Sequence, residues 1–120
     1  MRNDLAKRLH DAQIACEKVV GFTSNMTVAE YSSNEVVRLA VERLLEIVGE
    51  ALSVVLKMDP SLQDRFPNLR RAVGLRNRII HGYDDINDAV IWDIVQTNVP
   101  PLARELGVLL DGAPDVEALE

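Results

Sequence analysis

The sequence predicts an all-α protein, an antiparallel bundle of four to five helices. Only 4% of its 120 residues are aromatic, and long segments rich in leucine and valine repeat apolar residues at helical spacing. No segment of alternating polarity is bounded by turn residues, as a half-buried strand would be. The connections between the predicted helices are short, which favours antiparallel neighbours.

The first predicted helix covers about residues 2–20, and Gly21 is expected to end it. One further helical turn is expected at 27–31. The helix has one apolar stripe, with spacings of four, three, four and three residues, formed by Leu5, Leu9, Ala12, Cys16 and Val19.

The second predicted helix is the longest, at about 33–57. Ser32 and Glu35 have the spacing of a capping box at its start, and it ends before Asp59-Pro60 because a residue before proline avoids the α region. Gly49 lies inside it, where glycine costs about 1 kcal/mol against alanine, and is expected to let another helix approach closely. Its stripe is Val37, Val41, Leu44, Val48, Leu52 and Val55, widened by Ala40, Leu45 and Leu56.

The C-terminal half predicts a turn at 61–66 and a helix at about 68–81 that Gly82 stops. Asn87 is expected to cap the next helix, whose stripe continues until Pro100-Pro101 kinks or breaks it. That stripe is Val90, Ile91, Ile94 and Val95, and the last segment, 101–110, carries Leu102, Leu106, Leu109 and Leu110. We expect one domain over 1–110 and an acidic, frayed tail over 111–120.

Composition narrows the class of protein. The formal net charge is −6 and the pI is about 4.9, which argues against a broad basic surface for nucleic acid but allows a small local phosphate site. No apolar run approaches the roughly 20 residues of a membrane span. The charged N-terminus lacks the apolar stretch of a signal peptide, and a single cysteine, Cys16, excludes an internal disulfide. We therefore expect a cytoplasmic protein without a membrane anchor.

An arginine lies in the apolar stripe of the helix at 68–81. At about 100° per residue, Arg76 falls at the centre of the cluster of Leu69, Ala72, Val73, Ile79 and Ile80. A buried guanidinium needs a carboxylate, here Glu42, Glu46 or Glu50 of the preceding helix, or a place at the edge of a cleft. The other arginines of this helix, Arg70, Arg71 and Arg78, are expected on a solvated face.

His81 follows Arg76 by five residues, which separates the two by about 140° on an ideal helix. Asn77 shares a flank with His81 at a spacing of four. Arg76 and His81 converge only if the helix end loosens at Gly82 or if a second chain supplies the other side of the site. A simpler interpretation of His81 is a cap at a helix C-terminus.

The segment RNRIIHGY, in which four residues separate arginine from histidine and one separates histidine from tyrosine, resembles the motif of the HEPN superfamily. Over about 1–110 the chain is similar to the HepT-like group. The resemblance includes AVERLLEIVGEAL at 40–52, GLRNRIIHGYDDIN at 74–87 and VIWDIVQTNVPPLARELGVLL at 90–110.

The resemblance implies a HEPN-like bundle that forms a homodimer with two motifs facing one cleft. It implies a metal-independent endoribonuclease, the toxin of a toxin–antitoxin pair, with RNA as substrate and Arg76 and His81 as catalytic residues. The antitoxin would be a nucleotidyltransferase of the MntA type that transfers AMP onto Tyr83. These residue types suit the chemistry, since histidine serves as base or acid near neutral pH, arginine holds a phosphate, and Asn77 would support either the histidine or the sugar.

Two alternatives come from other classes of protein. The same bundle would serve as a non-catalytic subunit that binds a nucleotide or a partner's substrate in a nucleotidyltransferase complex. A metal enzyme is disfavoured, because His10 and His81 are the only histidines and no HxxxH, HExxH or CxxC spacing occurs. No glycine-rich phosphate loop appears, and we expect neither a metal nor a cofactor.

Overall fold

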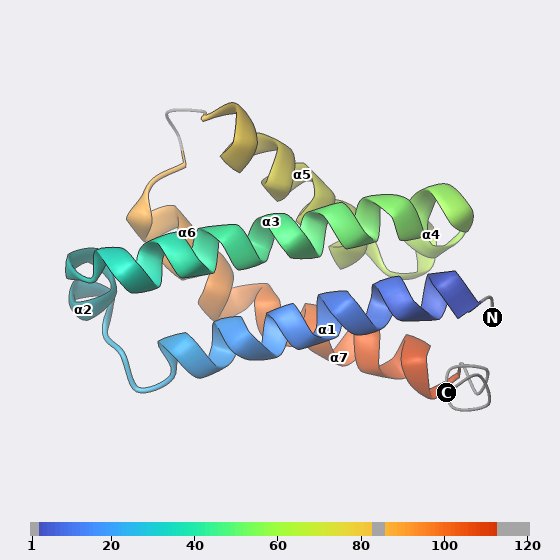
Figure 1. Cartoon of the computed structure of the whole chain (residues 1–120), viewed down its shortest axis with the longest axis horizontal. Helices are drawn as coiled ribbons and strands as arrows, with labels where there is room; N and C mark the ends of the chain where they lie inside the picture. The colour runs from blue at the N-terminus through green and yellow to red at the C-terminus, as the bar shows by residue number, and fades with distance from the viewer. Residues whose placement is uncertain (1–2, 83–85, 113–120) are drawn as a thin grey trace.

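The computed structural model describes residues 3–82 and 86–112. These residues form helices and no strand, which confirms the all-α prediction (Figure 1). In chain order the helices are α1 (Asn3–Thr23), α2 (Val28–Ser33), α3 (Glu35–Met58), α4 (Leu62–Arg65), α5 (Pro67–His81), α6 (Asp88–Thr97) and α7 (Val99–Asp111).

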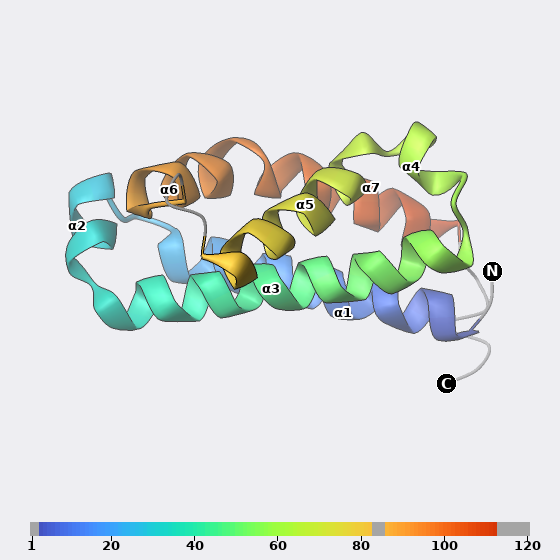
Figure 2. The ribbon, with the colours of Figure 1, turned by 90° about the horizontal axis from the view of Figure 1, so that it is seen from above.

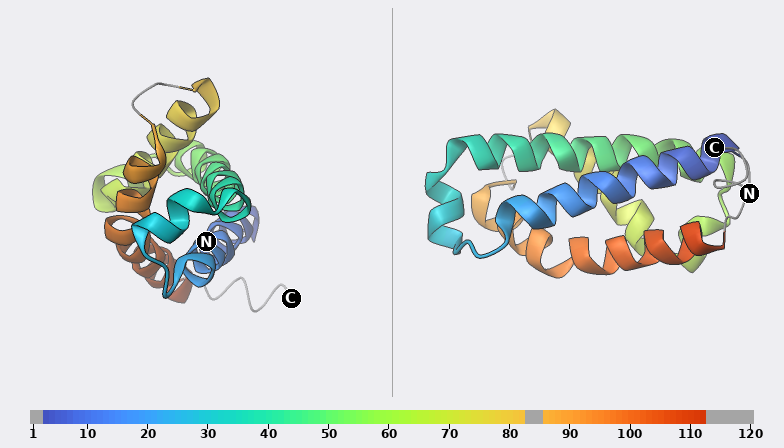
Figure 3. Two further views of the ribbon diagram at one scale, coloured as in Figure 1. Left: turned by 90° about the vertical axis from the view of Figure 1, so that its left-hand side faces the viewer. Right: turned by 60° about the horizontal axis from the view of Figure 1, so that its bottom comes forward.

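The four longest helices, α1, α3, α5 and α7, build the bundle. α1 packs against α3 and α7, and α3 packs against α5. Figure 3 shows α1 between α3 and α7, and Figure 2 shows α5 running obliquely between α3 and the segment formed by α6 and α7. α1 and α3 are antiparallel, as are α3 and α5 (Figure 1). The predicted antiparallel bundle is therefore present, with α5 on its flank.

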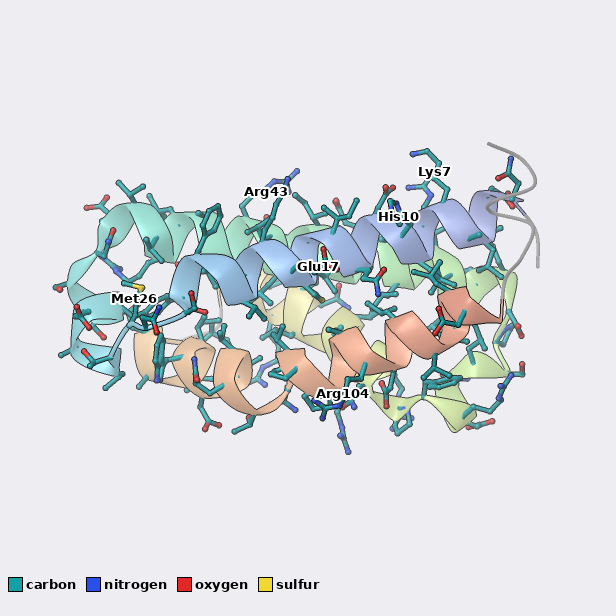
Figure 4. All side chains as sticks on the ribbon, turned by 90° about the horizontal axis from the view of Figure 1, so that it is seen from below. Lys7, His10, Glu17, Met26, Arg43 and Arg104 are labelled. Carbon is teal, nitrogen blue, oxygen red and sulfur yellow. The ribbon has the colours of Figure 1, made fainter. Side chains whose placement is uncertain are left out.

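The core is built from the predicted stripes. Every residue of the α1 stripe is buried, and Leu45 replaces Leu44 as the more deeply buried leucine of α3. Polar and charged side chains cover the outside, as Figure 4 shows for Lys7 and His10 of α1, Arg43 of α3 and Arg104 of α7. The other large contributors to the core are Val41, Val48, Leu52, Val55, Leu102, Leu106 and Leu109.

Two predicted helix ends were wrong. α1 continues through Gly21 to Thr23, and the left-handed residue that follows it is Asn25, at φ 65°. The cap of α3 is Asn34, whose side chain accepts a hydrogen bond from the Val37 N–H. Ser32 instead lies in the last turn of α2.

The capping box belongs to α2. The Thr27 hydroxyl accepts from the Glu30 N–H, and the Glu30 carboxylate accepts from the Thr27 N–H. α2 is the expected extra turn, and it is fixed by Tyr31, which is 1% exposed and has its ring centroid 5.3 Å from that of Trp92 in α6.

The turn at 61–66, the stop of α5 and the cap of α6 are confirmed, whereas the break predicted at Pro100-Pro101 lies earlier, at Asn98. α4 is the expected turn, Gly82 follows the last residue of α5, and Asn87 caps α6 by accepting from the Val90 N–H. The break before the last helix lies at Asn98, so Pro100 and Pro101 fall in the first turn of α7, where proline is tolerated because those N–H groups have no helical partner.

Candidate functional site

The helix that carries the motif, α5, has clear start and stop signals. Pro67 is its first residue. Gly82 adopts the left-handed conformation at φ 64°, and its N–H donates to the carbonyls of Arg78 and Ile79. Leu69 is fully buried and anchors the helix to the bundle. The helix therefore stays regular through His81, its last residue.

At Gly49 of α3, α5 approaches α3 closely. A Cβ atom added at Gly49 would overlap the Cβ of Arg76, and it would lie 2.8 Å from Arg76 Cγ and 3.0 Å from the Ala72 carbonyl oxygen. Only glycine leaves room for this approach. The close approach expected at Gly49 is confirmed, and the helix that makes it is the one that carries Arg76.

Arg76 has an ion-pair partner, but at the surface of the bundle and not in its core. Arg76 Nη2 lies 3.4 Å from Glu50 Oε1, and the two side chains are 30% and 51% exposed. Glu46 pairs instead with Arg43, at 3.2 Å. An ion pair this exposed contributes about 0–1 kcal/mol, so Glu50 is a carboxylate that another anion can replace.

The remaining contacts of Arg76 fix its orientation. Its Nη1 donates to Asn77 Oδ1 at 3.1 Å. Its Nε is buried and, within residues 3–82 and 86–112, makes no hydrogen bond. The stem of the side chain is thus packed against α3, and the end of the guanidinium reaches solvent. Asn77, which the sequence placed on the flank of His81, is paired with Arg76.

His81 is exposed at the C-terminal end of α5. Because the helix is regular up to this residue, His81 and Arg76 project from it about 140° apart. A loosened helix end, one of the two ways for them to converge, is not what this helix shows. Tyr83, the third residue of the motif, lies outside the described residues.

A groove lies on another side of α5, bounded by α3 and by the α6–α7 junction. Its volume is about 290 Å³. Arg71 and Arg78, both exposed, line it together with Gly74. These arginines were predicted to lie on a solvated face, and the groove itself was not predicted. The available signal was the spacing of three, four and three residues that links Arg71, Gly74, Arg78 and His81 on one stripe.

In the part of the chain that the structure describes, no group of three or more histidine, cysteine, aspartate or glutamate side chains is placed to hold a metal ion. Over the same residues, no helix combines the length and apolar character needed to cross a membrane.

The chain has relatives across most of its length. Residues 12–109 match the model of the family described as "Ribonuclease HepT-like", which confirms the resemblance drawn from the motif. "Putative RNase MJ1380" of Methanocaldococcus jannaschii is 33% identical over 110 residues, covering 90% of this chain and 98% of that protein. "Probable ribonuclease HepT" of Thermococcus cleftensis is 29% identical, covering 78% of this chain and 84% of that protein. No solved structure matches.

Proposed function

Because the chain belongs to the ribonuclease HepT-like family, we propose that it is a metal-independent endoribonuclease with Arg76 and His81 as its catalytic residues. The observation that carries this proposal is the state of Arg76. It is an arginine seated in an apolar stripe, held by its stem against Gly49, and its guanidinium reaches solvent. Among the described residues its one ion-pair partner is the exposed Glu50, beside the hydrogen bond to Asn77.

The proposed reaction is transfer within the RNA itself. The 2′-oxygen attacks the neighbouring phosphorus, a P–O bond forms as the bond to the 5′-oxygen breaks, and a 2′,3′-cyclic phosphate and a 5′-hydroxyl result. His81 takes the proton from the 2′-hydroxyl or gives one to the leaving 5′-oxygen, and water carries out the other of these two proton transfers. Arg76 exchanges Glu50 for the phosphate and stabilises the charge that builds on it, and Asn77 keeps the guanidinium oriented through the Nη1 bond.

The site is proposed to form between two copies of the chain. Arg76 and His81 leave α5 in different directions, so a symmetric dimer would place Arg76 of one subunit opposite His81 of the partner subunit. Exposed apolar side chains on α3 and α5 support an interface between two copies. Val36 and Leu39 of α3 are 78% and 58% exposed, and Ile80 of α5 is 47% exposed.

We place the protein in the cytoplasm as the toxin of a toxin–antitoxin pair. Its proposed antitoxin is a nucleotidyltransferase of the MntA type that attaches AMP to Tyr83, two residues beyond His81. A nucleotide there adds negative charge and bulk beside the cleft and repels RNA. Tyr83→Phe is expected to stay toxic in cells that also make the antitoxin, and intact-mass measurement of the wild-type chain should then show added nucleotide.

Cleavage in the absence of metal tests the activity. The purified chain is incubated with total RNA and with tRNA in EDTA, beside His81→Ala and Arg76→Ala, whose folding is checked by circular dichroism. Wild-type cleavage that leaves 2′,3′-cyclic phosphates, reduced at least about 100-fold in both variants, is expected. Intact RNA from a chain whose mass shows no modification would rule out the ribonuclease and favour a binding subunit.

Mixing the two variants tests the shared site. In a mixed dimer of Arg76→Ala and His81→Ala, one composite site keeps both catalytic residues, so an equal mixture should recover about a quarter of the wild-type activity. If each site lies within one subunit, every site carries one substitution and the mixture stays inactive. That result would refute the composite site while leaving the ribonuclease assignment intact.

A further inference from the structure

We propose that the groove between α3, α5 and the α6–α7 junction binds single-stranded RNA next to the cut. A base would lie on its apolar floor, and the backbone phosphates would lie against Arg71 and Arg78. This inference rests on the proposed ribonuclease function, since it extends the RNA site away from Arg76 and His81, but its evidence is separate.

The lining of the groove combines an apolar floor with a basic edge. Its polar side chains are Arg71, Arg78, Asn68 and Asn98, and none of its lining residues is acidic. In a chain of net charge −6, a groove whose described lining holds two arginines and no carboxylate is a local site for an anion. Its floor consists of Leu45, Val48, Ala72, Leu75, Ile94, Val99 and Leu102.

Arg71 is held at this edge by neutral groups. Its Nη1 donates to Asn68 Oδ1 at 3.0 Å, and Asn68 Nδ2 in turn donates to Glu105 Oε1 at 3.1 Å. The Asn68 amide thus lies between the Arg71 guanidinium and the Glu105 carboxylate. Arg71 is thus oriented toward the groove by an amide and has no direct ion pair with Glu105. Its guanidinium can therefore bind a phosphate.

Gly74 keeps the groove open. It lies in the middle of α5, where glycine is less stable than alanine. A Cβ added there would meet no atom within 4 Å, and its φ is not positive, so neither packing nor backbone conformation requires glycine. The volume of about 290 Å³ is at the lower limit of ligand pockets and suits one nucleoside. A larger side chain at position 74 would fill it.

The groove leads toward the catalytic histidine. Arg71, Gly74, Arg78 and His81 are spaced three, four and three residues apart, so they follow one stripe of α5. At a rise of 1.5 Å per residue, Arg78 lies about 10 Å along the helix from Arg71, and His81 lies about 5 Å further. A strand that follows the two arginines therefore reaches His81.

Binding of an RNA that cannot be cut tests the groove without relying on catalysis. A short 2′-O-methyl oligonucleotide is titrated by fluorescence anisotropy against wild type, Gly74→Leu and Arg71→Gln at several salt concentrations. Arg104→Gln, an equal loss of charge on α7 outside the groove lining, is the matched control. Melting curves confirm that each variant folds, as the open space at Gly74 leads us to expect.

Gly74→Leu is expected to weaken binding about tenfold with an unchanged salt dependence, because it removes the space for the base. Arg71→Gln should weaken binding and lower the slope of log K against log salt by about 0.7, the value for one phosphate contact on a single strand. Arg104→Gln should change neither. Wild-type affinity in Gly74→Leu would overturn the proposal, and so would AMP binding as tightly as the oligonucleotide, since a mononucleotide site needs no strand.

The outcome separates this inference from the ribonuclease assignment. If wild type cuts RNA and the groove variants bind and cut RNA as well as wild type does, the groove is not an RNA-binding site and the ribonuclease assignment stands. If wild type cuts no RNA but the oligonucleotide binds in a way that depends on Gly74 and Arg71, the ribonuclease assignment is refuted and RNA binding in the groove stands. A wild-type chain that neither binds the oligonucleotide nor cuts RNA refutes both.

Discussion

Gly49→Ala tests the packing that holds Arg76, the proposed catalytic arginine. Considered only as a position inside a long helix, Gly49 should be improved by alanine, because glycine in a helix interior costs about 1 kcal/mol against alanine. The structure predicts the opposite sign. The new Cβ would overlap Arg76 Cβ and approach the Ala72 carbonyl oxygen to 3.0 Å, and neither atom is at the end of a flexible side chain.

The magnitude follows from two opposed terms. Forcing an extra carbon into a packed interface costs about 1–3 kcal/mol, and the upper part of that range applies where a whole helix must move. Subtracting the gain of about 1 kcal/mol in helix propensity leaves a net loss of about 1–2 kcal/mol. For a chain of this length we expect the melting temperature to fall by roughly 4–8 °C.

Gly74→Ala is the matched control, because it makes the same change on the helix that faces α3. A Cβ at Gly74 meets nothing within 4 Å, so only the propensity term remains, and the variant should gain about 1 kcal/mol. Both variants and wild type are compared by urea unfolding at one protein concentration, because the stability of a dimer depends on concentration. If Gly49→Ala proves as stable as wild type or more so, α5 does not rest on α3 at this point, and the account of how Arg76 is positioned fails.

Three further results are expected. Asn34→Ala should lower stability by about 1 kcal/mol, whereas Ser32→Ala should change it by less than about 0.5 kcal/mol in the same urea titration, because Asn34 caps α3. Cys16 is buried, and burial raises the pKa of its thiol to about 12; at pH 8 it should react with a thiol reagent roughly 1000-fold more slowly in the native chain than in urea, and equal rates would contradict this. Burial, followed by the charge of Asp88, raises the pKa of Glu42 above its ordinary 4.5. The folded state therefore holds the Glu42 proton more tightly than the unfolded chain, and the stability that this group contributes is lost as pH rises above about 4.5. Glu42→Gln should melt at a higher temperature than wild type at pH 7 but not at pH 4.

The sequence predicted those parts of the fold that depend on local signals. The stripe of α1, the stop of α5 at Gly82 and the cap at Asn87 all come from residues within a few positions of one another. The start of α3 was misplaced because adjacent serine and asparagine residues offer several acceptable caps. The choice of Asn34 depends on α2, which Tyr31 fixes by packing against Trp92, a residue far along the chain.

In the site, too, local signals could be predicted from the sequence and packing between helices could not. Helical periodicity placed Arg76 in an apolar stripe and limited its partner to three glutamates of one helix. Which glutamate it meets depends on how α5 is rotated against α3, and that rotation is set at Gly49. The groove could not be predicted from α5 alone, because its walls also come from α3, α6 and α7.

The two proposed catalytic residues are positioned in different ways. The stem of Arg76 is fixed between α3 and α5. Its guanidinium lies at the edge of the bundle, where a bound phosphate would replace Glu50. His81 is the last residue of a helix that ends at a left-handed glycine, and it follows a basic groove on another side of that helix. A rigid, regular α5 keeps the two apart within one chain. If both residues are catalytic, as proposed, this separation calls for a second copy, and activity per chain should fall on dilution below the dissociation constant of the proposed dimer.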